Sequence, residues 1–208
     1  SENTESGRYY TLDNGKKLPS VTTVTGWKKN QFFINWRAKN PKEAKRVTAR
    51  GNLLHSLLED YVNNETVCLK DIPPIECDLF LQMQSEIDKI DNVRGTELAL
   101  SSEMVGVAGR ADCIAEYDGK LSIIDFKGST RKKYKGNIDN YFLQATAYAL
   151  MWQEMTQEKI EQVAIIIGCE TGDTQVFTDN PLNWVRPLQR EIKEYTEKFP
   201  QVESASLF

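Results

Sequence analysis

Hydrophobic residues recur at helical spacing through most of the first half of the chain. Ser20 is placed to cap a helix that runs through Val24 toward Trp27. Asn40 followed by Pro41 predicts the start of a second helix, which continues to about residue 62. Apolar positions between 79 and 90 have the spacing of a further helix. The aromatic residues at 32, 33 and 36 form an apolar stripe that is expected to pack on the core.

The pattern changes from helical to strand periodicity at about residue 97. Short alternating or fully apolar stretches predict strands at 97–103, 110–117, 121–126, 162–169 and 174–178. Helices are expected at 139–154 and 182–199, and the first residues are expected to be disordered before a short strand that ends at 11. This order predicts an α/β fold with a central mixed sheet flanked by helices. We expect residues 1–208 to form one domain, with a mainly helical part at about 19–92 and an α/β core at about 93–200.

One hairpin turn brings candidate chemistry together. Asp118 followed by Gly119 is a strong signal for a two-residue turn, and such a turn fixes the register of the flanking strands. In that register Asp112 lies directly opposite Asp125, with β-carbons roughly 5 Å apart. Lys127 follows Asp125 by two positions and is expected on the same face. The hairpin therefore predicts two carboxylates and an ammonium side by side.

Paired carboxylates repel each other unless a cation lies between them, and their hard oxygens suit Mg²⁺ or Mn²⁺. A nearby ammonium at Lys127 would orient or deprotonate a water and offset negative charge in a phosphoryl transition state. The alternative is a cross-strand network of ion pairs on a solvated face. The apolar residues around Asp125 predict a largely buried strand, where idle charge is costly, and so favour the metal site.

Charge and cysteine content narrow the functional classes. The net charge is −4, yet basic residues dominate between positions 28 and 50 and again at 131–135. Such a segregated surface fits either a phosphate-binding groove or a solvated helix face. The four cysteines are irregularly spaced and predict neither a zinc site nor an iron–sulfur cluster. No apolar run is long enough to cross a bilayer and the N-terminus is polar, so we expect no membrane association and an intracellular location.

Four short motifs resemble those of the PD-(D/E)XK nuclease superfamily, and in particular its RecB-like exonuclease group. Gly109 to Asp112 matches G-x-x-D, residues 125–127 match D-x-K, Gly51 to His55 matches G-x-x-x-H, and Gln144 to Tyr148 matches Q-x-x-x-Y. Residues 19–24 resemble the opening of the mitochondrial and phage members of the group. The resemblance covers roughly residues 19–148 and implies a restriction-endonuclease-like core.

The resemblance also implies roles for individual residues. His55, Asp112, Asp125 and the backbone carbonyl of Phe126 would hold the metal, and Lys127 would be catalytic. Glu103 matches an acidic position that binds a second metal or its water, although an exposed glutamate at a strand end explains it equally well.

Residues expected near the DNA lie on both sides of this set. Gln144 and Tyr148 would face the substrate backbone, with ordinary core packing as the alternative for Tyr148. The expected phosphate contacts are Arg50, Ser129, Arg131, Lys132 and Lys133. Gly128 departs from the threonine or serine that relatives often carry after the lysine, which puts one phosphate contact in doubt.

The candidate metal site and the motifs together predict a Mg²⁺- or Mn²⁺-dependent nuclease. The resemblance implies that it is a DNA exonuclease that prefers single-stranded DNA or DNA ends and acts in DNA degradation, repair, recombination or replication-end processing. If the gene belongs to a phage, the host cytoplasm is the expected location. Aromatic residues at 27, 32, 33 and 36 interleaved with basic ones predict a stacking lobe for single strands, or plain core. Two alternatives stay open: a structure-specific or sequence-specific endonuclease on the same core, and a catalytically silent DNA-binding or annealing module.

Overall fold

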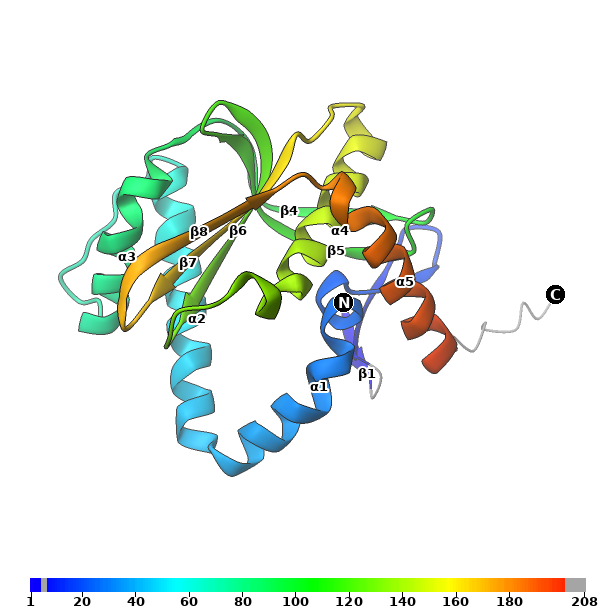
Figure 1. Ribbon diagram of the computed structural model, residues 1–208, viewed down its shortest axis with the longest axis horizontal. Helices are drawn as coiled ribbons and strands as arrows, with labels where there is room; N and C mark the ends of the chain where they lie inside the picture. Colours follow the sequence, from blue (N-terminus) through cyan, green and yellow to red (C-terminus); the bar gives the residue numbers. More distant parts are fainter. Residues whose placement is uncertain (5–6, 201–208) are drawn as a thin grey trace.

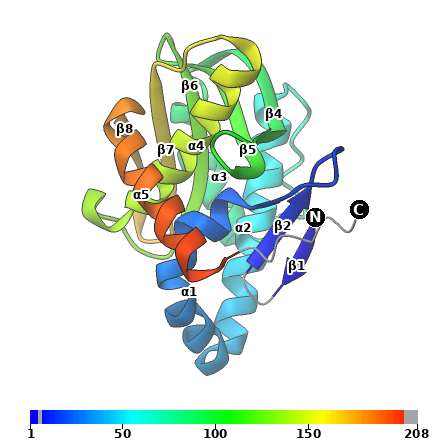
Figure 2. The same cartoon turned by 90° about the vertical axis from the view of Figure 1, so that its right-hand side faces the viewer.

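A computed structural model describes residues 1–4 and 7–200 of the chain. It begins with a small antiparallel sheet of β1 (Glu2–Thr4), β2 (Gly7–Thr11) and β3 (Lys17–Pro19), in that order. The expectation of a disordered start is wrong for residues 2–4, because β1 pairs with β2 and an ion pair of 2.6 Å joins Glu2 to Lys17. Figure 2 shows this sheet beside the first helix.

The first two long helices project away from the rest of the molecule. Helix α1 (Val21–Lys39) begins at Ser20, whose hydroxyl accepts a hydrogen bond from the Thr23 amide at 3.0 Å. It runs well past the expected end at Trp27, and α2 (Pro41–Val62) follows at once after Asn40. Figure 1 shows α1 and α2 as the two arms of a V that points away from the large sheet.

The expected packing of the aromatic stripe on the core is wrong. Phe32 is 67% exposed and Phe33 is 44% exposed, because they lie on the half of α1 that extends beyond the sheet. Only the start of α1 contributes buried residues, namely Val21, Val24 and Thr25. The second half of the helix is therefore a surface element with large apolar side chains.

The central sheet contains five strands in the order of the sequence. They are β4 (Ile90–Ser102), β5 (Val107–Tyr117), β6 (Lys120–Ser129), β7 (Gln162–Cys169) and β8 (Gly172–Asp179). Strands β6 and β7 are parallel and the other neighbours are antiparallel, so the predicted mixed sheet is confirmed. β4 begins several residues before the expected position 97.

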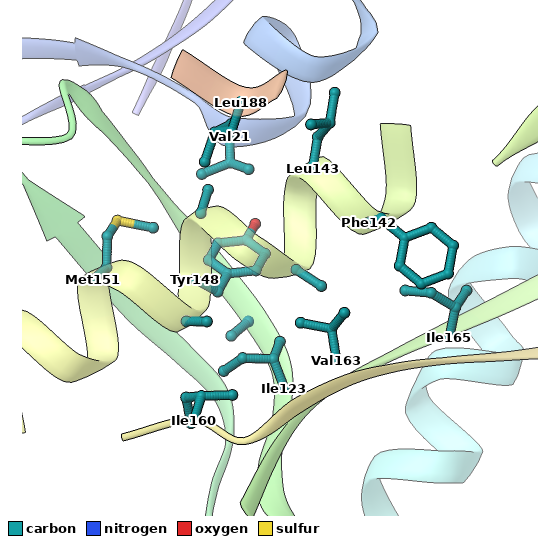
Figure 3. Packing of buried hydrophobic residues seen from close by; sticks show 14 of the residues in the cluster. Val21, Ile123, Phe142, Leu143, Tyr148, Met151, Ile160, Val163, Ile165 and Leu188 are labelled. Carbon is teal, nitrogen blue, oxygen red and sulfur yellow. The ribbon is translucent and has the colours of Figure 1, made fainter. Parts of the chain in front are cut away.

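Helices cover both faces of this sheet. Helix α4 (Asp139–Thr156), after the short 3-10 turn η1 (Lys135–Asn137), makes the crossover that a parallel β6–β7 pair needs. With α5 (Leu182–Lys198) and the start of α1 it buries one face, and Figure 3 shows Tyr148 and Val21 in this core above Ile123 and Val163. Helices α2 and α3 (Pro74–Ile87) bury the other face. Within the described part of the chain, no helix combines the length and hydropathy needed to cross a bilayer.

The β5–β6 hairpin has the predicted turn and register. Asp118 and Gly119 have φ angles of 52° and 75°, the left-handed values that this type of turn requires. Tyr117 pairs with Lys120, and the pairing continues to Cys113 opposite Ile124. It ends there, one step before the expected Asp112–Asp125 pair. Beyond that point β5 continues beside β4 and β6 continues beside β7.

Candidate metal-dependent active site

The sheet opens into a fork, which is the gap between β5 and β6 beyond Cys113 and Ile124. The Asp112 carboxylate fills this gap and accepts a hydrogen bond from the Phe126 amide, with 3.0 Å between Oδ2 and N. A side-chain oxygen thus takes the place of the strand carbonyl that would have continued the pairing. The expected direct Asp112–Asp125 pair is therefore corrected: Asp112 lies between the strands, and both carboxylates still meet at the fork.

Three possible metal ligands converge at the fork from three different elements. His55 comes from α2, Glu97 from β4 and Asp112 from β5, and their ligand atoms all lie within 4.8 Å of one another. His55 Nδ1 is 3.6 Å from Asp112 Oδ2. All three side chains are partly buried, so they lie at the base of an open site.

The negative charge of Glu97 is only partly compensated by its neighbours. Burial raises the pKa of the Glu97 carboxyl, and the negative charges of Asp112 and Glu59 raise it further. Arg110 opposes this shift, but its ion pair with Glu97 is long, at 3.5 Å. A bound cation would lower the raised pKa of Glu97, since it stabilises the ionised form of each carboxyl.

Asp125 and Lys127 form a tight pair beside the three ligands. Lys127 Nζ donates to Asp125 Oδ1 at 2.6 Å and lies 4.0 Å from Asp112 Oδ2. Asp125 is 2% exposed, and burial raises the pKa of its carboxyl although Lys127 opposes the shift. Burial alone would lower the pKa of Lys127, but the carboxylates of Asp125 and Asp112 outweigh it and raise that pKa. Lys127 is thus held as an ammonium.

One oxygen in this pair has no partner. Asp125 Oδ2 is buried and accepts no hydrogen bond from any described residue. An unpaired buried carboxylate oxygen is costly, and such atoms are usually explained by a water or an ion. With His55, Glu97 and Asp112 nearby, the donor set of one imidazole and several carboxylate oxygens fits a divalent cation such as Mg²⁺ or Mn²⁺.

The structure places Glu103 away from the fork. It lies on the turn after β4, where its carboxylate pairs with Lys16 at 3.0 Å and accepts a hydrogen bond from Asn14. Six residues of strand separate it from Glu97, roughly 20 Å. Glu97 is the acidic residue that sequence reasoning missed. The pairs Thr96↔Cys113 and Leu98↔Ala111 put it opposite Asp112, which the sequence could have indicated only with the length of the β4–β5 turn known.

Arg50 is an internal residue. It is 4% exposed, its guanidinium forms an ion pair with Glu170, and it donates to the carbonyl of Gly128 at 3.1 Å and to Thr130 at 3.2 Å. A β-carbon at Gly128 would lie only 3.3 Å from Arg50 Nε, so the glycine next to Lys127 makes room for this arginine. Burial argues against the expected direct contact between Arg50 and a phosphate.

The other expected DNA contacts divide by exposure. Ser129, Gln144 and Tyr148 are 6%, 8% and 2% exposed, so they lie within the fold. Arg131 and Lys132 are exposed and Lys133 is partly exposed, on the segment that follows β6. Lys132 is paired with Asp173 at 2.8 Å. The cations available to a ligand from this group are therefore Arg131 and Lys133.

Two curated proteins and a solved structure resemble this chain. Mitochondrial genome maintenance exonuclease 1 of Homo sapiens is 28% identical over 204 residues, covering 87% of this chain and 59% of the human protein. The Mus musculus protein of the same name is 27% identical over 203 residues, covering 87% of this chain and 60% of its own length. The chain thus spans about three fifths of these curated relatives. Among solved structures, a protein from Eubacterium rectale aligns at 11% identity over 72% of this chain and 65% of its own, with a TM-score of 0.49.

The family assignment rests on the match of a family model to this chain. The sequence model described as the PD-(D/E)XK nuclease superfamily matches residues 71–205, well over half of the chain. That range contains the whole central sheet and both strands of the fork. The chain belongs to the PD-(D/E)XK nuclease superfamily.

Proposed function

We propose that this protein is a divalent-metal-dependent DNA exonuclease that hydrolyses phosphodiester bonds at the fork. One observation carries the proposal: His55, Glu97 and Asp112 meet beside a buried Asp125 oxygen that has no partner among the described residues. The exonuclease assignment is supported by the names of the two curated relatives. Within this proposal residues 1–208 act as one nuclease domain, with a helical part at about 19–92 and a catalytic core at about 93–200.

The residues of the fork fit a Mg²⁺ or Mn²⁺ site. His55, Asp112, Asp125 and the carbonyl of Phe126 would hold the ion, and Glu97 takes the acidic role first expected of Glu103. Such an ion supplies Lewis-acid polarisation of the phosphate and lowers the pKa of a bound water.

Lys127 acts as a hydrogen-bond donor in this proposal. Without a metal, the carboxylates of Asp125 and Asp112 raise the pKa of Lys127, so it is placed to offer a positive charge to the phosphate. The position is well defined, because Asp125 holds the ammonium at 2.6 Å and the Tyr141 ring lies 5.4 Å from the same nitrogen. The lysine therefore meets the developing negative charge without reorganising.

DNA with a free or single-stranded end is the proposed substrate. The exposed cations Arg131 and Lys133 follow β6 directly after the catalytic lysine, where they can contact the phosphate backbone. Degradation, recombination, repair and replication-end processing are the processes in which such an activity would be used.

The test is a cleavage assay on 5′- and 3′-labelled single-stranded, duplex and covalently closed circular DNA with Mg²⁺, Mn²⁺ or EDTA. We expect linear DNA to be shortened only with metal and closed circles to survive. Lys127→Ala and Glu97→Gln should abolish or greatly slow cleavage. Glu103→Gln is the matched control, because it removes an equivalent charge outside the fork, and it should leave the rate unchanged.

Each alternative has its own signature in this assay. Cleavage of the closed circle would replace the exonuclease with a structure-specific or sequence-specific endonuclease. DNA binding with no product in either metal would replace it with a binding or annealing module. Loss of activity in Glu103→Gln but not in Glu97→Gln would show that the acidic metal ligand is Glu103 and not Glu97 on β4.

A further inference from the structure

A cavity of about 450 Å³ lies between the arms of the V and the end of β6. Its walls come from the second half of α1, the first half of α2 and the segment after β6, which Figure 1 shows on the open side of the V. We call it the aromatic cavity. Its lining includes the rings of Phe32, Phe33 and Trp36, and the cations Arg37, Arg131 and Lys133 beside the buried Arg50.

The rings of this cavity are open to solvent. Phe32 and Phe33 are 67% and 44% exposed, and their centroids lie 5.5 Å apart with planes at 74°. Two neighbouring exposed phenylalanines on one helix are unusual for a surface without a ligand, since burying such rings is favourable. Edge-to-face packing between them leaves ring faces free to stack on a flat partner.

The cations of the cavity are also available. Within the described residues, Arg37, Arg131 and Lys133 form no ion pair, whereas their neighbours Arg46 and Lys132 are paired with Glu43 and Asp173. Glu43 lines the cavity as well, but Arg46 holds it through two hydrogen bonds. A ligand with a flat apolar part and negative charge therefore fits this cavity.

The cavity adjoins a second cavity, at the fork, along α2. Val47 and Thr48 line it, and they also line a second cavity of about 500 Å³ whose wall includes His55 and Glu97. Thr48 and His55 are seven positions apart on one helix, so their separation along the axis is roughly 10 Å. A DNA strand spans that length with only a few nucleotides.

We propose that the aromatic cavity binds an unpaired base of the substrate strand, a few nucleotides from the phosphate at the fork. Arg37, Arg131 and Lys133 contact the phosphates beside that base. This inference rests on the proposed nuclease function for the position of the cleaved phosphate, but not for binding of the strand. Since a base in a duplex presents no free face, the cavity requires a single strand at this position.

The experiment measures DNA binding and cleavage separately. Single-stranded oligonucleotides carrying one abasic position, moved step by step along the strand, are bound in EDTA and cleaved in Mg²⁺. The variants are Phe33→Leu and the double change Phe33→Leu with Trp36→Leu. Ile34→Ala is the matched control, because Ile34 is an exposed apolar residue of the same helix that does not line the cavity. A small aryl phosphodiester, too short to reach the cavity, reports on the fork alone.

We expect the double variant to bind the intact strand about tenfold more weakly, as loss of base stacking predicts. One abasic position should weaken binding by the wild type but make no further difference to the double variant. Cleavage of the small diester and binding by Ile34→Ala should be unchanged. Equal loss in Ile34→Ala, or an abasic penalty that persists in the double variant, would overturn the inference. If no DNA is cut in any metal, the proposed function fails and the binding arm in EDTA still decides the cavity.

Discussion

Tyr148 occupies the space that a side chain at Gly109 would need. A β-carbon at position 109 would lie 2.8 Å from the Tyr148 hydroxyl oxygen and 3.0 Å from its Cε1. The two residues belong to separate motifs, G-x-x-D on β5 and Q-x-x-x-Y on α4. Their contact packs α4 against β5 only three residues before Asp112, so one motif fits against the other.

Gly109→Ala should therefore destabilise the protein by about 1–3 kcal/mol, the usual cost of forcing extra atoms into a packed core. For a chain of this length each kcal/mol lowers the Tm by about 2–4 °C. Thermal unfolding of Gly136→Ala is the control, because a β-carbon there would have no atom of another described residue, beyond its chain neighbours, within 4 Å. If Gly109→Ala and Gly136→Ala both have the Tm of the wild type, Tyr148 does not restrict the side chain at position 109.

Mg²⁺ should stabilise the protein in the absence of DNA. A cation at one hundred times its Kd adds about 2.7 kcal/mol, which corresponds to a rise in Tm of about 5–10 °C. Asp112→Asn should lose most of this rise, whereas Glu103→Gln should retain it. Equal shifts in the two variants would place the ion outside the fork.

The stabilisation by Mg²⁺ should grow with pH. The pKa of Glu97 is raised in the folded protein, so the folded state binds more protons than the unfolded state and stability falls as pH rises through this window. A bound cation removes that loss. The difference in Tm with and without Mg²⁺ should be larger at about pH 8 than at about pH 5, and Glu97→Gln should flatten the dependence.

Glu170 should stabilise the fold at neutral pH and lose this effect in acid. Burial opposes its ionisation, but hydrogen bonds from Arg46 and Arg50 hold the pKa of its carboxyl below the ordinary value. Stability from such a group is complete above the unfolded pKa of about 4.3 and is lost as pH falls through the lower folded pKa. Glu170→Gln should cost roughly 3 kcal/mol near pH 7, because it leaves the Arg50 charge buried.

The free energies of unfolding of Glu170→Gln and the wild type, measured by urea denaturation, should converge as the pH approaches about 3. Asp173→Asn provides the control three residues away. Its carboxylate is 83% exposed although it pairs with Lys132, and its removal should make no measurable difference at either pH. A constant gap between Glu170→Gln and wild type at all pH values would contradict the ion-pair explanation.

Replacement of the glycine in the Asp118–Gly119 turn should destabilise the protein. Gly119 has a φ of 75°, which costs an alanine about 1 kcal/mol, whereas asparagine at Asp118 tolerates its φ of 52°. Gly119→Ala should lower the Tm and Asp118→Asn should not. Equal melting of both variants would show that the turn does not constrain the hairpin.

The sequence predicts the site best where short-range rules apply. The turn at 118–119 fixes the register of its own hairpin, and period-2 alternation correctly puts Lys127 beside Asp125. The N-cap at Ser20 and the start of α2 at Pro41 also follow from local chemistry. Each of these depends on residues that are close together in the chain.

Features that depend on distant contacts were missed. Glu97 joins the fork through pairing of β4 with β5, and no local signal distinguished it from Glu103. The sequence predicts Arg50 as a phosphate contact at the surface. It is buried instead, because it pairs with Glu170, which is far away along the chain. The stripe at Phe32 and Phe33 has the periodicity of a core-facing helix, but the sheet is too short to cover it. Periodicity shows which side of a helix is apolar, not whether another element reaches it.

Helix α2 carries both His55 and one wall of the aromatic cavity, so it sets the distance between the fork and the cavity. Its rise sets the interval between the place where a strand would be held and the place where it would be cut. One residue inserted between Thr48 and His55 would turn the two by about 100° relative to each other. Under the two proposals, the shortest strand that could be both bound and cleaved would be set by the length of one helix and would not depend on the base sequence.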